Sequence, residues 1–266
     1  MRRCWGMEAS RDMRRKKSEN LVLLSGGLDS AVNLLMALRR GGVGLAVTVD
    51  YGQRAARREV ERASALCAVH GVRHEVIAAK WLGKYSRDAL TTPGVAFTGV
   101  AAGTEGAGDG EPTTARDDAS LHALWVPNRN GLLANVGACL AEALGMRYVV
   151  MGLNAEEGAV FPDNSPAFIR EMNRAFSYST LSRVRLRSFT KNMNKMEIMA
   201  EALACGLDFR YLWSCYNEGE LMCGSCPSCA RLLAAAEGLG VRDRLKGYFG
   251  SGRSPQGDAG QRGEIP

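Results

Sequence analysis

The sequence lacks any apolar run that approaches the length of a membrane span, and its first twenty residues lack the apolar stretch that a signal peptide requires. Its eight cysteines are too few, in a chain of 266 residues, to suggest a secreted disulfide scaffold. The sequence also contains no internal repeat. These absences argue against membrane, secreted and repeat proteins, so we expect a cytoplasmic globular protein without membrane association.

The composition is that of an ordinary globular protein. Hydrophobic residues make up 46% of the chain and charged residues 23%, so one large α/β domain, or one domain with an appendage, can bury a sizeable core. The net charge of +6 is uneven, because residues 1–20 hold seven Arg or Lys and only three Asp or Glu. We interpret this segment as a solvated tail, and nucleic-acid binding is an alternative that only the tail supports. Translation from Met7 or Met13 instead of Met1 would shorten it.

Short apolar runs alternate with longer amphipathic segments along most of the chain. Strands are expected at 21–25, 43–50, 73–78, 146–152 and 184–189. Helices are expected after the first strand up to residue 38, and at 54–70, 125–145 (after a short loop), 166–180, 194–206 and 229–238. This alternation predicts the α/β class with a doubly wound parallel sheet.

A glycine-rich hexapeptide, SGGLDS at residues 25–30, separates the first expected strand from the first expected helix. Two glycines let the backbone approach a phosphate, and the free N–H groups and dipole of the following helix favour an anion there. Ser25 and Ser30 add hydroxyl donors, whereas Asp29 suits a Mg²⁺ ion carried by the phosphates. A plain turn with a capped helix is the alternative. The pattern predicts a phosphate site.

Four of the cysteines form the spacing C-x7-C-x2-C-x2-C near the carboxyl end. Tetrahedral zinc takes four thiolates at about 2.3 Å, and C-x2-C turns can supply them. Four sulfurs leave no open position on the metal, so we predict a structural zinc held by Cys215, Cys223, Cys226 and Cys229. An iron–sulfur cluster and a group of unrelated core cysteines are the alternatives.

The SGGLDS segment resembles the PP-loop of the N-type ATP pyrophosphatases, and it differs from a P-loop because it has no GK[ST]. Further segments, in this order, resemble the 7-cyano-7-deazaguanine synthase (QueC) family: DYGQR, VPNRN, GLNAEE, FPD, NKMEI and the four-cysteine block. The resemblance covers about residues 20–240. It implies an ATP-dependent ligase that adenylates 7-carboxy-7-deazaguanine, forms an amide with ammonia, and activates the amide with a second ATP to leave the nitrile.

The resemblance also implies roles for individual residues. Asp29, Arg129 and Lys195 would be catalytic, and Asn130, Asn154 and Asp163 would bind the substrate. The nucleotide would be held by Leu24, Ser25, Gly26, Gly27, Leu28, Asp29, Ser30, Tyr51, Gly52 and Gln53. Simpler interpretations are a surface charge at a helix start for Arg129 and Lys195, a turn after Pro162 for Asp163, and strand-end packing for Tyr51.

Four positions depart from the family pattern. Ala55 stands where the family has His after DYGQR, and Asn164, Ser165 and Ala167 replace Cys, Arg and Glu after the Pro-Asp pair. We expect these positions to lie where the substrate is recognised. The alternatives are therefore a ligase that stops at the amide or transfers the activated acid to another amine, for example on a protein, a PP-loop tRNA-thiolating enzyme, and a nucleotide-binding module without chemistry.

The domain plan places a basic tail at 1–19 and a PP-loop ATP-binding domain at 20–206 that contains a mobile loop at about 91–120. A small zinc-binding subdomain follows at 207–248, and a disordered tail at 249–266 ends the chain. The family resemblance further implies a homodimer, with ATP, ammonia and the deazaguanine acid as small-molecule partners.

Overall fold

The computed structural model describes residues 18–95, 97 and 123–250. The expected terminal tails and most of the expected loop at 91–120 lie outside these residues. Within the described part of the chain, no helix is both long enough and apolar enough to cross a membrane.

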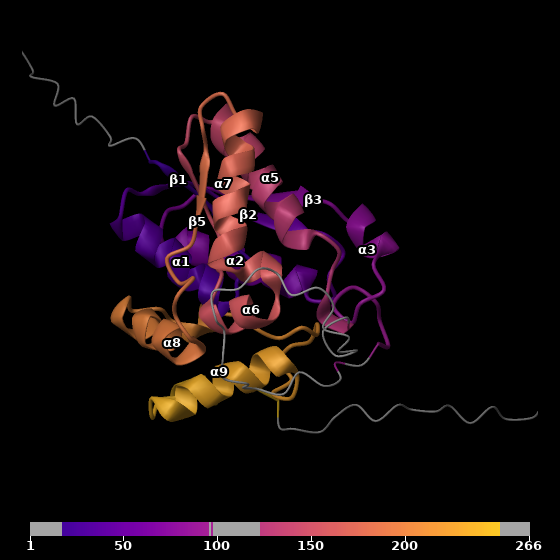
Figure 1. Cartoon of the computed structure of the whole chain (residues 1–266). Coiled ribbons are helices and arrows are strands. Elements are labelled where there is room, and N and C mark those ends of the chain that lie inside the picture. Colours follow the sequence, from indigo (N-terminus) through magenta and orange to yellow (C-terminus); the bar gives the residue numbers. More distant parts are fainter. Residues whose placement is uncertain (1–17, 96, 98–122, 251–266) are drawn as a thin grey trace, which may run out of the picture.

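A five-stranded, all-parallel sheet forms the centre of the protein (Figure 1), as the sequence predicts. Its strands are β1 (Asn20–Leu23), β2 (Val43–Asp50), β3 (His74–Ala78), β4 (Tyr148–Val150) and β5 (Arg185–Arg187), in the order β3-β2-β1-β4-β5. Every residue of β1 is buried, which explains its uninterrupted apolar pattern. The chain runs outward from β1 to β3 and then returns to place β4 on the other side of β1. This reversal opens a crevice at the carboxyl ends of β1 and β4, where doubly wound folds bind ligands.

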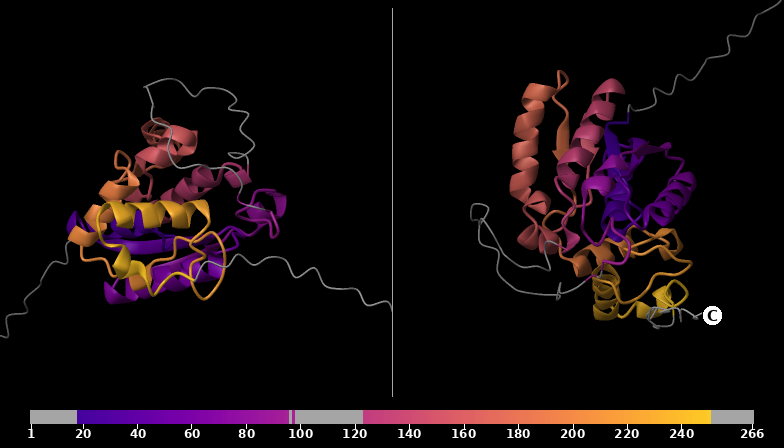
Figure 2. Two further views of the ribbon diagram at one scale, coloured as in Figure 1. Left: turned by 90° about the horizontal axis from the view of Figure 1, so that it is seen from below. Right: turned by 90° about the vertical axis from the view of Figure 1, so that its right-hand side faces the viewer.

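Helices cover both faces of the sheet (Figure 2). Val22 of β1 joins a core with α1 and α2, whereas Leu21 and Leu23 join the opposite core with α5 and α7, because alternate strand residues point to opposite faces. The helices are α1 (Leu28–Arg39), α2 (Ala56–Val69), α3 (Trp81–Tyr85), α5 (Arg129–Ala143), α6 (Ala155–Val160), α7 (Pro166–Ser179), α8 (Lys195–Ala204) and α9 (Pro227–Gly238), with 3-10 turns η1 (Pro162–Asn164), η2 (Phe209–Tyr211) and η3 (Arg242–Leu245).

The carboxyl-terminal segment packs onto the main domain. Helices α8 and α9 lie together below the sheet in Figure 1, and the buried residues of α9 belong to the same apolar cluster as those of α1 and α8. The Trp213 N–H also donates to the carbonyl oxygen of Gly26, at 2.8 Å. Met222, which precedes α9, pairs with Phe249, which follows it, in an isolated bridge. The carboxyl-terminal segment that carries the four cysteines therefore shares one apolar core with α1 and α8.

Strand ends and short helices differ most from expectation. The strand expected at 21–25 ends at Leu23, and the one expected at 146–152 covers only Tyr148–Val150. The residues after each strand turn instead into the loops that line the crevice. The short helices α3 and α6 were not expected, because five or six residues carry too little periodicity to signal a helix.

Candidate active site

The phosphate loop forms a tight turn that two serine hydroxyls hold together. Gly26 adopts a left-handed φ of 77°, which a side chain would disfavour. The Ser25 N–H donates to Ser30 Oγ at 3.2 Å, and Ser30 Oγ donates to the carbonyl oxygen of Gly27 at 3.1 Å. Gly27 begins α1 without a side-chain cap. The first N–H groups of α1 therefore have no side-chain cap, as an anion-binding helix start requires.

The end of β4 lies directly against the start of α1. A Cβ atom added to Gly152 would lie 2.6 Å from the Ser30 nitrogen and 2.8 Å from the carbonyl carbon of Asp29. Both are backbone atoms, so no side-chain movement could relieve the overlap. Gly152 thus permits the contact that brings the loop after β4 to the phosphate loop.

Asp29 forms a buried ion pair that joins three segments of the chain. Lys195 Nζ donates to both carboxylate oxygens of Asp29 at 2.8 Å, and Asn154 Nδ2 donates to Asp29 Oδ2 at 2.7 Å. Burial lowers the pKa of Lys195, but the charges of Asp29 and Glu157 outweigh it and the pKa is raised. Lys195 is held there because Asn194 and Glu197 cap α8 reciprocally. The pair places one cation and one anion beside the open helix start.

A second charged group, formed by Arg129 and Asp163, lies across the crevice, near the carboxyl end of β2 and the start of α5. The Arg129 guanidinium lies 5.9 Å from the centre of the Tyr51 ring, and its Nε donates to Asn130 Oδ1 at 3.2 Å. Burial raises the pKa of Asp163 although Arg129 opposes the shift. Asn164 Nδ2 donates to Asp163 Oδ1 at 2.9 Å, and Asn130 Nδ2 to the Asp163 carbonyl at 3.2 Å. Hydrogen bonds thus hold Asp163 both at its carboxylate and at its main chain.

These groups line one cavity of about 250 Å³ at the carboxyl edge of the sheet. Trp125 and Phe161 form part of its wall and stack with ring centroids 6.1 Å apart and an interplanar angle of 22°. The cavity therefore joins polar groups suited to phosphates with a flat aromatic wall suited to a planar ring.

Most of the predicted site residues line this cavity: Leu24, Ser25, Gly27, Leu28, Asp29, Ser30, Tyr51, Gln53, Arg129, Asn130, Asp163 and Lys195. Gly26, Gly52 and Asn154 lie behind it. The Gly26 carbonyl accepts the Trp213 N–H, Gly52 has a φ of 92° and packs against Gly83, and the fully buried Asn154 holds Asp29. The interpretation of Arg129 and Lys195 as surface charges is wrong, because both line the cavity and Lys195 forms a buried ion pair.

The expectation that all four departures lie at the recognition surface is wrong for two of them. Ala55 and Asn164 line the cavity, but Ser165 and Ala167 do not. Ser165 Oγ instead caps α7 by accepting the Phe168 N–H at 3.1 Å, and Ala167 is exposed.

Sequence reasoning missed the charged residues that reach the cavity from distant segments: Glu59, Glu157 and Arg231. An Arg231 nitrogen donates to Glu157 Oε1 at 3.3 Å and to the Tyr216 hydroxyl at 3.2 Å. Two signals were available: Glu157 ends the GLNAEE segment, and Arg231 follows Cys229 by two residues, so that whatever fixes Cys229 also fixes Arg231.

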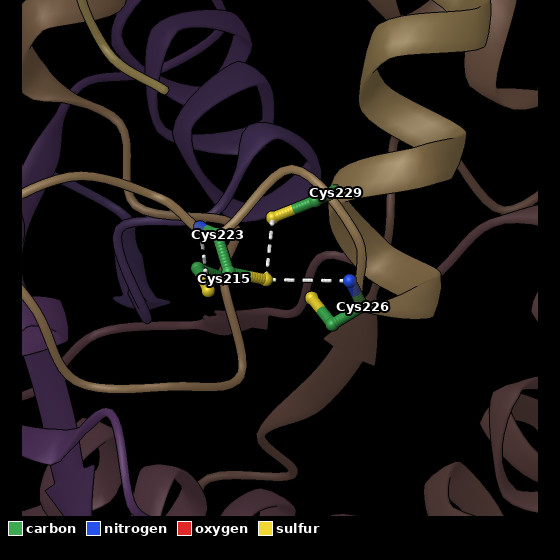
Figure 3. A group of neighbouring side chains, drawn as sticks. All are labelled: Cys215, Cys223, Cys226 and Cys229. Carbon is green, nitrogen blue, oxygen red and sulfur yellow. Dashed lines mark hydrogen bonds between the residues drawn. The ribbon is translucent and has the colours of Figure 1, made fainter. Parts of the chain in front are cut away.

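The four predicted cysteines converge at the start of α9 (Figure 3), and their sulfurs all lie within 4.8 Å of one another. The Cys223 and Cys229 sulfurs are 4.0 Å apart. Four thiolates about 2.3 Å from a tetrahedral zinc would lie about 3.8 Å from one another, so this spacing fits the metal. The N–H groups of Asn217 and Cys223 point at Cys215 Sγ at 3.3 and 3.4 Å, and such donors stabilise thiolates. The cluster is suited to a metal ion.

Comparisons with known proteins find similar sequences over most of the chain. The family described as "Queuosine biosynthesis protein QueC" matches residues 19–239. The chain is 44% identical over 223 residues to the 7-cyano-7-deazaguanine synthase of Pelotomaculum thermopropionicum and 45% identical over 222 residues to that of Desulforudis audaxviator; each alignment covers 84% of this chain and 98% of the relative. An NMN synthetase structure from Francisella tularensis is 12% identical, with a TM-score of 0.41 over 90% of both chains, a likeness too weak to bear on activity.

Proposed function

Because the chain belongs to the QueC family of queuosine biosynthesis proteins, we propose that it is an ATP-dependent 7-cyano-7-deazaguanine synthase that acts on 7-carboxy-7-deazaguanine and ammonia. The observation that carries the proposal is the meeting, in one cavity, of an uncapped helix start, the Asp29–Lys195 pair and an aromatic wall. ATP requires the first two features and a planar deazapurine the third.

The reaction uses two molecules of ATP. The substrate carboxylate attacks the α-phosphate of the first ATP and releases pyrophosphate, and ammonia then displaces AMP to give the amide. The amide oxygen attacks the α-phosphate of the second ATP, again releasing pyrophosphate. Loss of AMP from this adduct leaves the nitrile. Each carboxylate oxygen thus departs on an AMP, because oxide itself is too poor a leaving group.

The phosphates would lie at the start of α1. Its free N–H groups and the hydroxyls of Ser25 and Ser30 supply donors, and Lys195 supplies the positive charge. A Mg²⁺ ion bound to the phosphates would be coordinated by the Asp29 carboxylate, which already pairs with the Lys195 ammonium group. In that state Lys195 would be free to move from Asp29 to the pyrophosphate.

The deazaguanine ring would lie between the aromatic wall and the Asp163 carboxylate. A carboxylate accepts hydrogen bonds from the paired N–H groups of a guanine-like edge, and Asn164 already orients that of Asp163. Arg129 would neutralise the reacting carboxylate or the α-phosphate, since it lies in the same cavity. The cysteine cluster would hold a zinc ion, which stabilises the fold and carries no step of the reaction.

A second candidate is a ligase that stops at the amide or passes the activated acid to a different amine. It is favoured by one observation, that Ala55 and Asn164 line the cavity where the family has larger or reactive side chains. Mass spectrometry of a reaction containing ATP, Mg²⁺, ammonium and the acid separates the two. We expect the nitrile as the main product with two pyrophosphates per substrate. Accumulation of amide with one pyrophosphate would support the ligase, and no pyrophosphate release would contradict both.

The remaining partners and the setting follow from the same proposal. Ammonia is the nitrogen donor, the assembly is a homodimer, and the enzyme works in the cytoplasm, where its nucleotide substrates are found. Size-exclusion chromatography with light scattering tests the dimer.

A further inference from the structure

Four carboxylates line the cavity, and two of them form ion pairs. Asp29 pairs with Lys195, Glu157 pairs with Arg231, and Asp163 accepts a hydrogen bond from Asn164. Among the described residues, Glu59 likewise forms no ion pair, and its carboxylate accepts only from the Gln53 amide. Within this part of the chain, two carboxylates at the site, Asp163 and Glu59, are thus without a directly paired cation, and Asp163 is the one expected to meet the guanine-like edge of the substrate.

The side chain of Gln53 connects the Glu59 carboxylate to the main chain at the end of β2. Gln53 Nε2 donates to Glu59 Oε2 at 2.8 Å, while Gln53 Oε1 accepts the Tyr51 N–H at 2.9 Å and the same Nε2 reaches the Val49 carbonyl at 3.2 Å. The main chain of Glu59 also touches the phosphate loop, because a Cβ atom on Gly26 would lie 3.0 Å from its carbonyl oxygen. Glu59 is therefore an oriented carboxylate beside the place where the activated substrate would lie.

The proposed reaction requires a group of this kind. Ammonia brings three N–H protons and the nitrile retains none, so three protons must leave one nitrogen. The first leaves as ammonia forms the C–N bond and the C–O bond to AMP breaks. The second leaves as the amide oxygen bonds to the α-phosphate, and the third as the remaining C–O bond breaks and the C≡N bond forms. Proton removal by a positioned side chain is commonly worth about 10²–10⁴-fold in rate.

We propose that Glu59 is the general base that takes these protons from the substrate nitrogen and returns them to solvent between steps. This role rests on the proposed nitrile synthesis. Asp29 and Glu157 are poorly suited to it, because each is already engaged in an ion pair, with Lys195 and Arg231 respectively. Asp163 is engaged by Asn164 at the expected recognition edge.

The electrostatics of Glu59 agree with a base that works near neutral pH. Burial raises its pKa to about 7, against the opposing effects of the Gln53 hydrogen bond and the Arg129 charge on α5, while Asp50 at the end of β2 adds to the increase. A carboxylate with this pKa both accepts and releases protons readily at neutral pH. The ionised, active form accumulates as pH rises through 7, so the rate of nitrogen incorporation should rise over the same range.

The test compares Glu59→Gln with the wild type and with Glu61→Gln, which alters an exposed glutamate on the same helix that pairs with Arg58. Two reactions are followed: exchange of labelled pyrophosphate into ATP with the acid but no ammonium, and formation of amide and nitrile with ammonium. Adenylation of the acid removes no proton. We therefore expect Glu59→Gln to retain exchange but to lose about 10²–10⁴-fold in amide and nitrile formation, and to lose the rise with pH near 7. Glu59→Asp should recover part of the rate.

Each outcome has a distinct meaning. Wild-type rates of nitrile formation by Glu59→Gln would overturn the role of Glu59 while leaving the proposed function intact. Equal loss of exchange and product formation would also overturn it, because Glu59 would then serve nucleotide binding. Absence of exchange in the wild type would instead overturn the proposed function. Metal content and urea midpoint of each variant establish that the variants are folded.

Discussion

Because Lys195 pairs with Asp29, we expect its replacement to lower the free energy of unfolding more than most single substitutions in the protein. Both side chains are only 13% exposed, and the Lys195 nitrogen lies 2.8 Å from each Asp29 oxygen. At an effective dielectric of about 20, two charges at this separation attract by about 6 kcal/mol. Desolvation cancels part of this attraction, so replacing Lys195 with Met should cost about 3–5 kcal/mol, because it leaves the Asp29 carboxylate buried with only the Asn154 amide as its neutral donor.

The assay is urea unfolding, read as a change in midpoint at constant slope. Combining Lys195→Met with Asp29→Asn should restore much of the lost stability, because no uncompensated charge then remains. The matched control is Lys246→Met, which breaks the ion pair between Lys246 and Asp243. These two charges are closer, at 2.6 Å, but their side chains are 78% and 83% exposed. Solvent screens that pair, so its midpoint should not move. Equal midpoints for Lys195→Met and Lys246→Met, or a double variant no more stable than Lys195→Met, would refute the reasoning.

Two further predictions concern the backbone contact and the cysteine cluster. Gly152→Ala should destabilise the protein by about 1–3 kcal/mol and weaken ATP binding in calorimetry, because its Cβ would overlap the backbone of Ser30. The control is Gly247→Ala, whose Cβ meets nothing within 4 Å and which should change neither stability nor ATP binding. Equal behaviour of the two variants would contradict the prediction. Elemental analysis should find one zinc per chain, and Cys229→Ser should lower the metal content and the urea midpoint, because metal binding at such a site stabilises the folded chain. Iron in place of zinc, or a variant with full metal content, would contradict this prediction.

The parts of the site that could be predicted without the family resemblance lie close together along the chain, whereas Arg129, Asp163 and Lys195 were named only because of that resemblance. The geometry of SGGLDS and that of the cysteine cluster each form within one short segment, so the local sequence is enough to predict them. The sequence suggested separate roles for the two residues, with Asp29 as a ligand of Mg²⁺ and Lys195 as a catalytic cation. Their direct bond spans 166 positions and follows from packing of α8 against α1.

Glu59 shows why other site residues could not be found in advance. It lies in ARREVER, where every charged residue suits the solvent face of a helix. Only the tertiary contact with Gln53 distinguishes it from the exposed Glu61. Ser165 illustrates the opposite error, because its nearness in sequence to Asp163 suggested a shared pocket, whereas a turn directs it to the start of α7.

The dependence of the phosphate loop on Trp213, and of the cavity on Arg231, has a consequence for biosynthesis on the ribosome. The loop at residues 25–30 leaves the ribosome early, but roughly 200 further residues must be added before Arg231 exists, which takes about 10–40 s at ordinary elongation rates. During this interval the nascent chain has its nucleotide loop without the segment that completes the cavity. A chain that has not yet reached Arg231 therefore lacks part of the cavity lining, and we expect ATP turnover to begin only after this residue has been added.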